Sequence, residues 1–344
     1  MKYITFTIPS YNSQEYMCHV IDNLVAVGDD IEVIIVNDGS KDDTGKIADE
    51  YQTKYPTIVK AIQKENGGHG SGVMAGIYNA TGIFYKVVES DDWVETKDVI
   101  AMLDLIKKHM QEGLDIDLYI TNYVYEHAND NTKFVMHYRK CLPVDKPFAW
   151  KEMKHVKLET VFLMHSLMYR LDKLKASGMV LPNHTFYVDD IYAYIPLPYM
   201  DKIFYHDLDF YHYFIGRGDQ SINYSIMCKR YEQQMRVFKI MFERYNYDEL
   251  KQMVKPLYKY MWHFLMIIGA ITIMTIVGTK EDKDIRKVTY KNYWNELKEK
   301  DPKLFKKFKR SLPGVLGFGL PGYNLKSFAS RKIYSGYQKK LKLG

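Results

Sequence analysis

The chain has 344 residues, of which 26% are charged, 47% hydrophobic and 15% aromatic. This composition indicates a folded protein with a large core and excludes a disordered or low-complexity chain. Its three cysteines, Cys18, Cys141 and Cys228, lie far apart without metal-binding or redox spacing, which excludes a disulfide-rich secreted scaffold. The first residues read as a strand rather than as the apolar part of a signal peptide, so we expect a cytoplasmic protein.

Strand and helix patterns alternate along the first part of the chain. Strand-like runs cover 3–9, 31–37, 57–64 and 82–88, and helix-like runs cover 13–27, 42–55 and 73–81. This alternation predicts an α/β fold with a mainly parallel sheet and crossover helices. Ligands of such sheets bind beyond the carboxyl ends of the strands.

Acidic residues gather at these predicted strand ends. The stretch Glu89-Ser-Asp-Asp-Trp93 follows one strand, and Asp38 follows another. We expect Asp38, Glu89, Asp91 and Asp92 to converge, and a divalent cation such as Mg²⁺ or Mn²⁺ would offset their repulsion. The alternative is that Ser90, Asp91 and Asp92 cap the following helix.

The segment Asn66–Gly72 contains four glycines and precedes a predicted helix. Glycines let main-chain N–H groups approach a phosphate closely, and a helix N-terminus favours an anion. Gly68 and His69 are therefore predicted to bind a phosphate or sugar, although a histidine in an ordinary turn would give the same pattern. The segment matches neither a P-loop nor a dinucleotide fingerprint.

The middle of the chain carries a second acidic pair. A predicted strand at 114–127 pairs with 132–140, and 165–178 has a helical pattern. Asp189 and Asp190 then lie within an aromatic run, where an apolar environment suits a general base and where they would also suit a helix cap. Arg217, in a turn with Gln220 and Ser221, is a predicted phosphate ligand or an ordinary surface residue.

The last part of the chain is helical and basic. Residues 280–344 contain 18 Lys and Arg against 6 Asp and Glu, a net charge of +12, whereas 1–279 carry 30 against 36, a net charge of −6. The lysines alternate with Leu, Phe and Tyr, which indicates either an interfacial helix on anionic lipid or a packed helix with a solvated basic face. The uncharged segment 260–278 is near the length of a membrane span, and it also fits a buried helix.

Taken together, these motifs resemble those of family-2 inverting glycosyltransferases of the GT-A fold. The resemblance covers about residues 1–222 and rests on "FTIPSYN", "EVIIVNDGSKDDT", "ATGIFYKVVESDDWV" and "FYVDD". It implies a Rossmann-like, mainly parallel sheet flanked by helices. We therefore expect a glycosyltransferase domain at 1–222 and a helical, basic region at 223–344. The glycine segment looks like that of a subgroup found in bacterial surface-polysaccharide enzymes.

The resemblance also implies roles for single residues. Pro9 and Tyr11 would flank the nucleotide base, and Asp38 would hold the uracil or ribose. Glu89 and Ser90 stand where the family has its Asp-x-Asp motif, with Asp91 binding the metal. Asp189 or Asp190 would be the catalytic base. Arg217, Gln220 and Ser221 would close over the pyrophosphate. Glu89 departs from the usual Asp, and "VDD" replaces the usual Glu-Asp pair.

These roles predict a metal-dependent enzyme, using Mn²⁺ or Mg²⁺, that moves a sugar from a nucleotide sugar (a UDP-sugar by preference) to a hydroxyl of a glycan or lipid-linked acceptor. The basic region would hold it on the inner face of the cell membrane, as a monomer or a homo-oligomer. One alternative is a non-catalytic scaffold that retains the fold. A nucleotidyltransferase would need a basic glycine-rich loop after the first strand, where this chain has "PSYNSQEY". Nucleic-acid binding would rest on the basic tail alone, whose bulky aliphatic residues favour lipid or packing.

Overall fold

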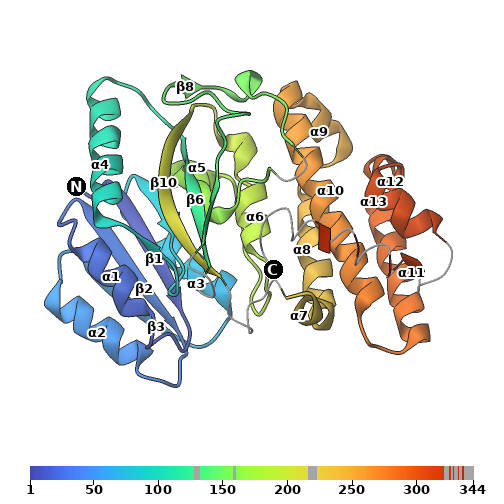
Figure 1. Cartoon of the computed structure of the whole chain (residues 1–344), viewed down its shortest axis with the longest axis horizontal. Coiled ribbons are helices and arrows are strands. Elements are labelled where there is room, and N and C mark those ends of the chain that lie inside the picture. Colours follow the sequence, from blue (N-terminus) through green and yellow to red (C-terminus); the bar gives the residue numbers. More distant parts are fainter. Residues whose placement is uncertain are drawn as a thin grey trace. The chain divides into compact units, whose positions relative to one another are not determined.

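The computed structural model describes residues 1–127, 132–157, 160–215 and 223–320, together with positions 325, 326, 328, 332, 335 and 336. The chain forms two compact units (Figure 1). Unit 1 comprises Met1–His155 and Phe162–Ile215, and unit 2 comprises Val156–Val161 and Gly216–Gly344. The sheet lies in unit 1, and unit 2 is helical in its described part.

The first half of unit 1 is a parallel sheet with crossover helices, as predicted. Its strands are β1 (Ile4–Ser10), β2 (Ile31–Asp38), β3 (Val59–Lys64) and β4 (Phe84–Val87), in the spatial order β3-β2-β1-β4. Its helices are α1 (Met17–Val25), α2 (Thr44–Lys54) and α3 (His69–Asn79). Every residue of β1 and β2 is buried, and both strands are rich in Ile, Val and Thr, which suits a strand covered on both faces.

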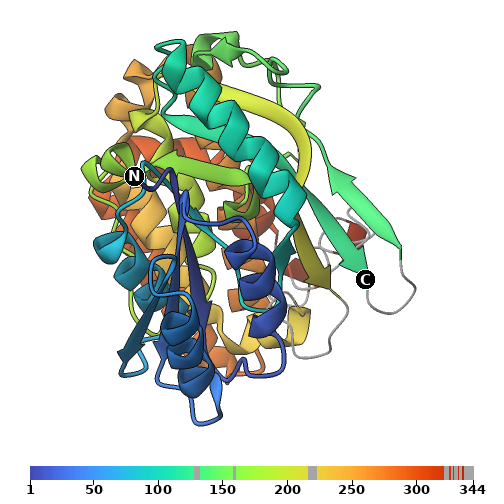
Figure 2. The same cartoon turned by 90° about the vertical axis from the view of Figure 1, so that its left-hand side faces the viewer.

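The helices cover the two faces of this sheet. In α1 the buried residues recur every three or four positions (Met17, Val20, Ile21, Leu24, Val25), so one stripe of the helix faces the core. Helix α1 packs on β2, and α4 (Thr96–Gln111) packs on α1 and on strand β10 (Figure 2). Helix α3 packs on β1 and β2 through small residues, since a Cβ added at Gly72 would lie 3.1 Å from the Cβ of Pro9.

The second half of unit 1 extends the sheet and mixes strand directions. It contains β5 (Trp93–Val94), β6 (Leu118–His127), β7 (Lys133–Met136), β8 (Pro147–Phe148), β9 (Leu167–Arg170) and β10 (Ile203–Ile215). The order continues from β4 as β9-β6-β10-β5, with β7 beside β6 and β8 beside β10. Strand β9 is antiparallel to β4 and β6, and β10 is parallel to β6. The predicted antiparallel pairing of 114–127 with 132–140 is confirmed as β6 with β7.

Two sequence-based assignments are wrong. The segment 165–178, expected to be one helix, forms strand β9 and the short helix α5 (Leu171–Ala176). Strand β9 lies between β4 and β6 and pairs with both, and this pairing overrides the local helical pattern. The glycine segment was expected to remain a loop as far as Gly72. Helix α3 instead begins at His69, and Gly70 and Gly72 are buried in its first turns.

The described helices of unit 2 are α7 (Tyr224–Lys229), α8 (Tyr231–Arg244), α9 (Tyr247–Gln252), α10 (Lys255–Gly278), α11 (Lys283–Lys300), α12 (Pro302–Lys309) and α13 (Leu312–Gly314), followed by a π-helical turn at Val315–Gly319. Helix α10 packs against α7, α8, α9, α11 and α13. Among the described residues, α10 alone is long and apolar enough to cross a membrane. However, 67% of its most apolar window is buried inside the protein, as expected of a core helix.

Helix α12 packs into unit 2 through its apolar residues. Its apolar residues Leu304, Phe305 and Phe308 are buried, and the ring of Phe308 stacks on Trp294 at 5.4 Å. Its lysines, by contrast, lie mainly on the exposed side. The alternation of basic and apolar residues therefore reflects a solvated face and a core face in this segment.

Candidate functional site

The turns after β1, β2 and β4 are hydrogen-bonded into one edge of the sheet. The main-chain N–H of Ser13 donates to Thr44 Oγ1 at 2.7 Å, and the hydroxyls of Ser13 and Ser90 lie 2.8 Å apart. The N–H of Asn12 donates to Ser40 Oγ at 2.9 Å. The parallel register of the three strands brings these turns together, as the sequence predicted.

Asp38, at the end of β2, organises the glycine turn. Its side chain is buried, and its carboxylate accepts hydrogen bonds from the N–H of Gly67 at 2.9 Å and of Gly68 at 2.7 Å. Lys64 at the end of β3 forms an ion pair with the same carboxylate. Asp38 thus neutralises a neighbouring lysine and fixes two main-chain donors next to the strand ends.

The glycine turn is also held from its other side. The N–H of His184 donates a 2.6 Å hydrogen bond to the carbonyl oxygen of Gly67. Gly68 has φ +82°, and a Cβ there would lie 3.1 Å from the main-chain N and Cα of His184. Only glycine fits both the left-handed conformation and this close approach. The turn is therefore attached to the segment that leads into Asp189.

His69 and Glu89 form an ion pair across the strand ends. His69 is the first residue of α3, and its Nε2 lies 2.8 Å from Glu89 Oε1. The two side chains are 28% and 21% exposed. Burial by itself would lower the pKa of His69, but Glu89, with Asp189 and Asp38, raises it to about 9. Burial likewise opposes ionisation of Glu89, yet His69 brings the pKa of Glu89 below its usual value. This pairing places a positive charge among the acids.

The two aspartates after Glu89 differ in environment. Asp91 is partly exposed, whereas Asp92 is 2% exposed and accepts hydrogen bonds from Tyr211 Oη at 2.6 Å and the N–H of Phe214 at 2.9 Å. Burial and the nearby Asp91 charge raise the pKa of Asp92. The oxygens of Asp92 thus hold β10 in this structure, and a part for Asp92 in a metal-binding group stays a prediction.

Asp189 and Asp190 begin the short helix α6 (Asp189–Tyr194) and are both partly buried. Burial raises the pKa of the Asp189 carboxyl, while His69 acts against that rise. Burial and Asp189 together raise the pKa of Asp190 further. Asp189 thus lies within electrostatic reach of the His69–Glu89 pair, which brings the two predicted halves of the site together.

Two buried groups near these acids, Lys86 and His165, were not predicted from the sequence. Lys86 in β4 is fully buried, and its Nζ donates to the carbonyl oxygen of His165 at 2.7 Å. Burial lowers the pKa of Lys86 to about 7 and that of His165 to about 4. A lysine inside the apolar run "GIFYKVV" was the available signal for Lys86, whereas no local pattern marks His165.

The remaining predicted residues have the following positions. Pro9 is buried in β1 beneath α3, and Tyr11 in the turn beyond it is 50% exposed. Ser90 is partly exposed beside Ser13. Arg217, Gln220 and Ser221 lie outside the described residues.

Within the described ranges, no three or more His, Cys, Asp or Glu side chains are arranged to hold a metal ion. The side chains present are nevertheless carboxylates, whose oxygens bind Mg²⁺ and Mn²⁺. They lie close together, since the charges of Glu89 and Asp91 both raise the pKa of Asp92. Carboxylates crowded in this way suit a cation that takes its other ligands from a bound phosphate.

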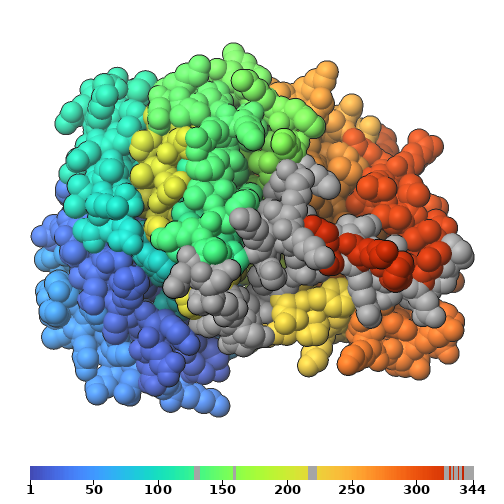
Figure 3. Space-filling view, in the orientation of Figure 1, coloured from blue at the N-terminus to red at the C-terminus, as the bar shows by residue number. Residues whose placement is uncertain are grey.

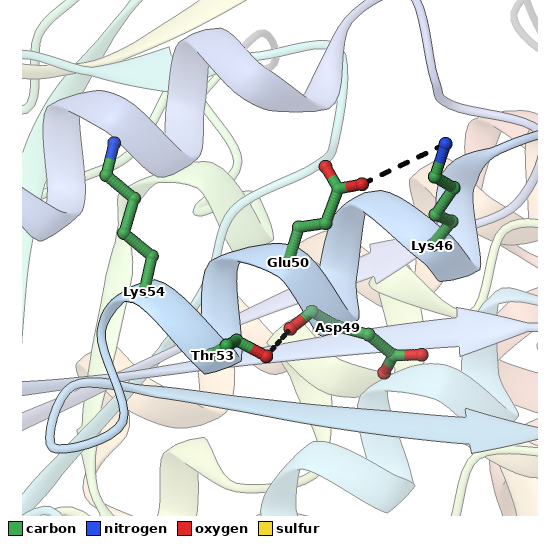
Figure 4. A pocket seen from close by; sticks show the side chains of 5 residues that line it. All are labelled: Lys46, Asp49, Glu50, Thr53 and Lys54. Carbon is green, nitrogen blue, oxygen red and sulfur yellow. Dashed lines mark hydrogen bonds and ion pairs between the residues drawn. The ribbon is translucent and has the colours of Figure 1, made fainter.

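A separate surface hollow lies on α2 and is lined by Lys46, Asp49, Glu50, Thr53 and Lys54 (Figure 4). Lys46 and Glu50 form a 3.9 Å ion pair, and Thr53 Oγ1 donates to the carbonyl oxygen of Asp49. All of these residues belong to one helix, and these contacts are local to it. We assign no function to this hollow.

The comparisons with known proteins agree with this geometry. The family described as "Glycosyl transferase family 2" matches residues 5–170. A protein named "Putative glycosyltransferase EpsH" from Bacillus subtilis (strain 168) is 36% identical over 124 residues, which is 36% of this chain and 34% of that protein. "Uncharacterized glycosyltransferase EpsJ" from the same organism is 28% identical over 192 residues, covering 54% of this chain and 53% of that protein. The chain thus matches about a third to a half of the length of these relatives.

A solved structure resembles the whole chain. The S. aureus TarS 1-349 structure in complex with UDP-GlcNAc superposes with a TM-score of 0.62 at 17% sequence identity, covering 99% of this chain and 92% of that one. At this identity the likeness concerns the fold alone. Unit 1 has the GT-A fold, as the sequence resemblance implied. Residues 5–170 thus resemble glycosyltransferase family 2.

Proposed function

We propose that the protein is an inverting glycosyltransferase that moves a sugar from a nucleoside-diphosphate sugar to a hydroxyl of a glycan or lipid-linked acceptor in bacterial cell-surface polysaccharide synthesis. The observation that carries this proposal is the convergence of three acids on His69. The charges of Glu89, Asp189 and Asp38 all raise the pKa of His69. The resemblance to the family implies that Asp38, Glu89 and His69 bind the donor. It implies that Asp189 removes a proton from the acceptor. The proposed donor-binding and acceptor-activating groups therefore lie within electrostatic reach of one another.

The donor would bind across the turns after β1, β2 and β4. Tyr11 is the exposed ring at this edge, and Asp38 holds the adjacent Gly67–Gly68 turn in place. The protonated His69 supplies a positive charge for a diphosphate. The similarity of fold to a protein solved with UDP-GlcNAc favours a UDP-sugar as the first donor to test.

The acceptor hydroxyl would lose its proton to Asp189. Of the two neighbours, Asp189 is the one that interacts electrostatically with His69 and Glu89, and His69 acts against the rise of its pKa. It is therefore better placed to be ionised and to face the donor. Proton removal during attack from the opposite side of the anomeric carbon would invert its configuration.

Asp91 would hold Mn²⁺ or Mg²⁺ together with the donor phosphates. Such a cation supplies neutralisation of the charge that develops on the leaving nucleoside diphosphate. Asp91 is partly exposed and follows Glu89 by two positions in the chain, which suits this role.

We further propose that the protein lies on an anionic membrane surface, on the cytoplasmic side. Lys306, Lys309 and Arg310 are exposed near Leu312, which is 71% exposed, and Val315, which is 54% exposed. Basic residues close to exposed aliphatic ones suit a lipid interface. Sedimentation with phosphatidylglycerol vesicles should be strong at low salt, and weak with phosphatidylcholine alone or in Leu312→Ser.

The donor site is tested by thermal unfolding with UDP, GDP, CDP or dTDP, each with Mn²⁺ or EDTA. A ligand that binds only the folded state raises the midpoint in proportion to its binding free energy. We expect one nucleotide, UDP first, to raise it in Mn²⁺ and not in EDTA. A well-folded sample that responds to no nucleotide would favour the non-catalytic scaffold instead.

A further inference from the structure

The acidic turn after β4 is tied at both ends by one buried tyrosine. The N–H of Asp92 donates to the carbonyl oxygen of Glu89 at 3.1 Å and closes a four-residue turn. Ser90 and Asp91 are its two corner residues. The hydroxyl of Tyr211 accepts the N–H of Glu89 at 3.1 Å and donates to Asp92 Oδ2 at 2.6 Å. Because a hydroxyl can donate and accept at once, a single atom holds the first and the last residue of the turn.

Tyr211 is itself held firmly in the sheet. It is 0% exposed, and its main chain pairs with Tyr123 of β6 and with Val94 of β5. The ring centroid of His165 lies 4.8 Å from that of Tyr211, and Lys86 Nζ lies 5.2 Å from the same centroid. Close packing around a buried ring fixes the direction of its hydroxyl. The turn is therefore anchored to a rigid point of the sheet.

The other contacts of the turn fall on either side of Asp91. The N–H of Phe214 donates to Asp92 Oδ1 at 2.9 Å, so β10 uses both carboxylate oxygens of Asp92. The hydroxyl of Ser90 lies 2.8 Å from that of Ser13. These contacts fix the main chain before and after Asp91, whose own side chain is partly exposed.

We propose that Tyr211 is a positioning residue for the metal ligand Asp91, because its hydroxyl holds the turn in the conformation that binds the cation. This inference rests on the proposed function, since it takes Asp91 as the ligand of Mn²⁺ or Mg²⁺. Groups that orient a metal ligand from behind commonly contribute about ten- to hundredfold to metal affinity. A role in packing alone would require the ring of Tyr211 and not its hydroxyl.

The experiment compares the wild type with Tyr211→Phe, which keeps the ring and removes the hydroxyl. The full chain is titrated with Mn²⁺ in saturating UDP, and free Mn²⁺ is followed by electron paramagnetic resonance. We expect the Kd for Mn²⁺ to rise about ten- to hundredfold in the variant. An excess of Mn²⁺ should restore the UDP-dependent thermal shift of Tyr211→Phe, whereas no excess should restore it in Asp91→Asn.

Tyr205→Phe is the matched control on the same strand. Tyr205 is also 0% exposed, and its hydroxyl accepts the N–H of Tyr138 at 3.1 Å. It donates to Asn122 Oδ1 at 2.7 Å or to Asp207 Oδ1 at 2.8 Å. None of these partners belongs to the acidic turn. The control should therefore lose a comparable free energy of unfolding and keep the wild-type Kd for Mn²⁺. An equal loss of Mn²⁺ affinity in both variants would overturn the inference.

If Tyr211→Phe does not fold, hydrogen exchange of the wild type decides. The N–H of Glu89 should exchange slowly in EDTA, because the Tyr211 hydroxyl holds it without any metal. An N–H that becomes protected only when Mn²⁺ and UDP are added would overturn the inference, since the cation would then order the turn.

The inference and the proposed function fail in different ways. A Tyr211→Phe variant that binds Mn²⁺ as tightly as the wild type would overturn the inference and leave the proposed function intact. A failure of the proposed function would appear in the wild type, which UDP and Mn²⁺ would then not stabilise, and the inference would fall with it.

Discussion

The N–H of His184 donates a 2.6 Å hydrogen bond to the carbonyl oxygen of Gly67, and this contact joins the two halves of the site. Gly67 belongs to the turn that the Asp38 carboxylate orders, and His184 precedes the helix that begins with Asp189. A displacement of one segment would therefore move the other. The proposed donor and acceptor groups are therefore held in mutual position by a main-chain contact as well as by side chains.

This contact makes Gly68 sensitive to substitution. In Gly68→Ala the new Cβ would lie 3.1 Å from His184 and the residue would keep φ +82°. We expect a loss of about 1–3 kcal/mol in the free energy of unfolding, together with weaker nucleotide binding. Denaturant unfolding measures the first quantity, and the UDP-dependent thermal shift measures the second.

Gly113→Ala is the matched control. Gly113 has φ +70°, but an added Cβ meets nothing within 4 Å. It should show only the backbone cost, about 1 kcal/mol, and normal nucleotide binding. Equal effects of the two substitutions would contradict a specific role for the Gly68–His184 approach.

Asp91→Asn tests the proposed metal ligand. The amide retains the size of the side chain but removes its charge, so the Mn²⁺-dependent stabilisation by UDP should disappear. That stabilisation is about 2.7 kcal/mol in the wild type at a hundredfold excess of UDP over its Kd. Thermal unfolding in Mn²⁺ and in EDTA measures it, and a Mn²⁺-dependent shift that survives in Asp91→Asn would refute the assignment.

His69→Gln tests the ion pair through the pH dependence of stability. The pKa of His69 is about 9 in the folded protein, whereas that of an unperturbed histidine is 6.5. Its stabilisation is therefore fully present below pH 6.5 and is lost as the pH rises through about 9. At pH 6 to 7 we expect the variant to be less stable by about 2 kcal/mol, as for other hydrogen bonds to charged groups.

The measurement is the unfolding free energy of both proteins between pH 6 and pH 10. The gap between wild type and His69→Gln should narrow steadily above pH 7. A gap that stays constant across this range would mean that His69 is neutral in the folded protein.

Asp189→Asn tests the proposed base. Loss of general-base catalysis should lower kcat about 10²- to 10⁴-fold and leave the UDP-dependent thermal shift intact. In the wild type, kcat/KM should fall at acidic pH with a midpoint above the ordinary aspartate value, because burial raises the pKa of Asp189.

Asp190→Asn is the companion variant. Burial and the charge of Asp189 raise the pKa of its carboxyl, and no charge of the His69–Glu89 pair is among the causes of that shift, so a smaller loss of kcat is expected. If Asp190→Asn lost more activity than Asp189→Asn, the two roles would have to be exchanged.

Much of this arrangement was predictable because it depends on local pattern. Buried β-branched runs ending in Asn-Asp-Gly or Glu-Ser-Asp-Asp specify parallel strands with polar ends, and parallel strands place those ends on one edge. The position of β9 was not predictable in this way. Its sequence has a helical pattern, and it is a strand because it forms hydrogen bonds with both β4 and β6.

The sequence by itself determined the class of fold, the strand ends that carry the site and the identity of its acids, because periodicity and turn residues are encoded locally. The tertiary structure decided the burial and the hydrogen-bond partners of each acid. Asp91 and Asp92 are adjacent in sequence, yet Asp92 is buried against Tyr211 while Asp91 stays partly exposed. Contacts between distant segments set burial and charge environment, and these are not written in any local pattern.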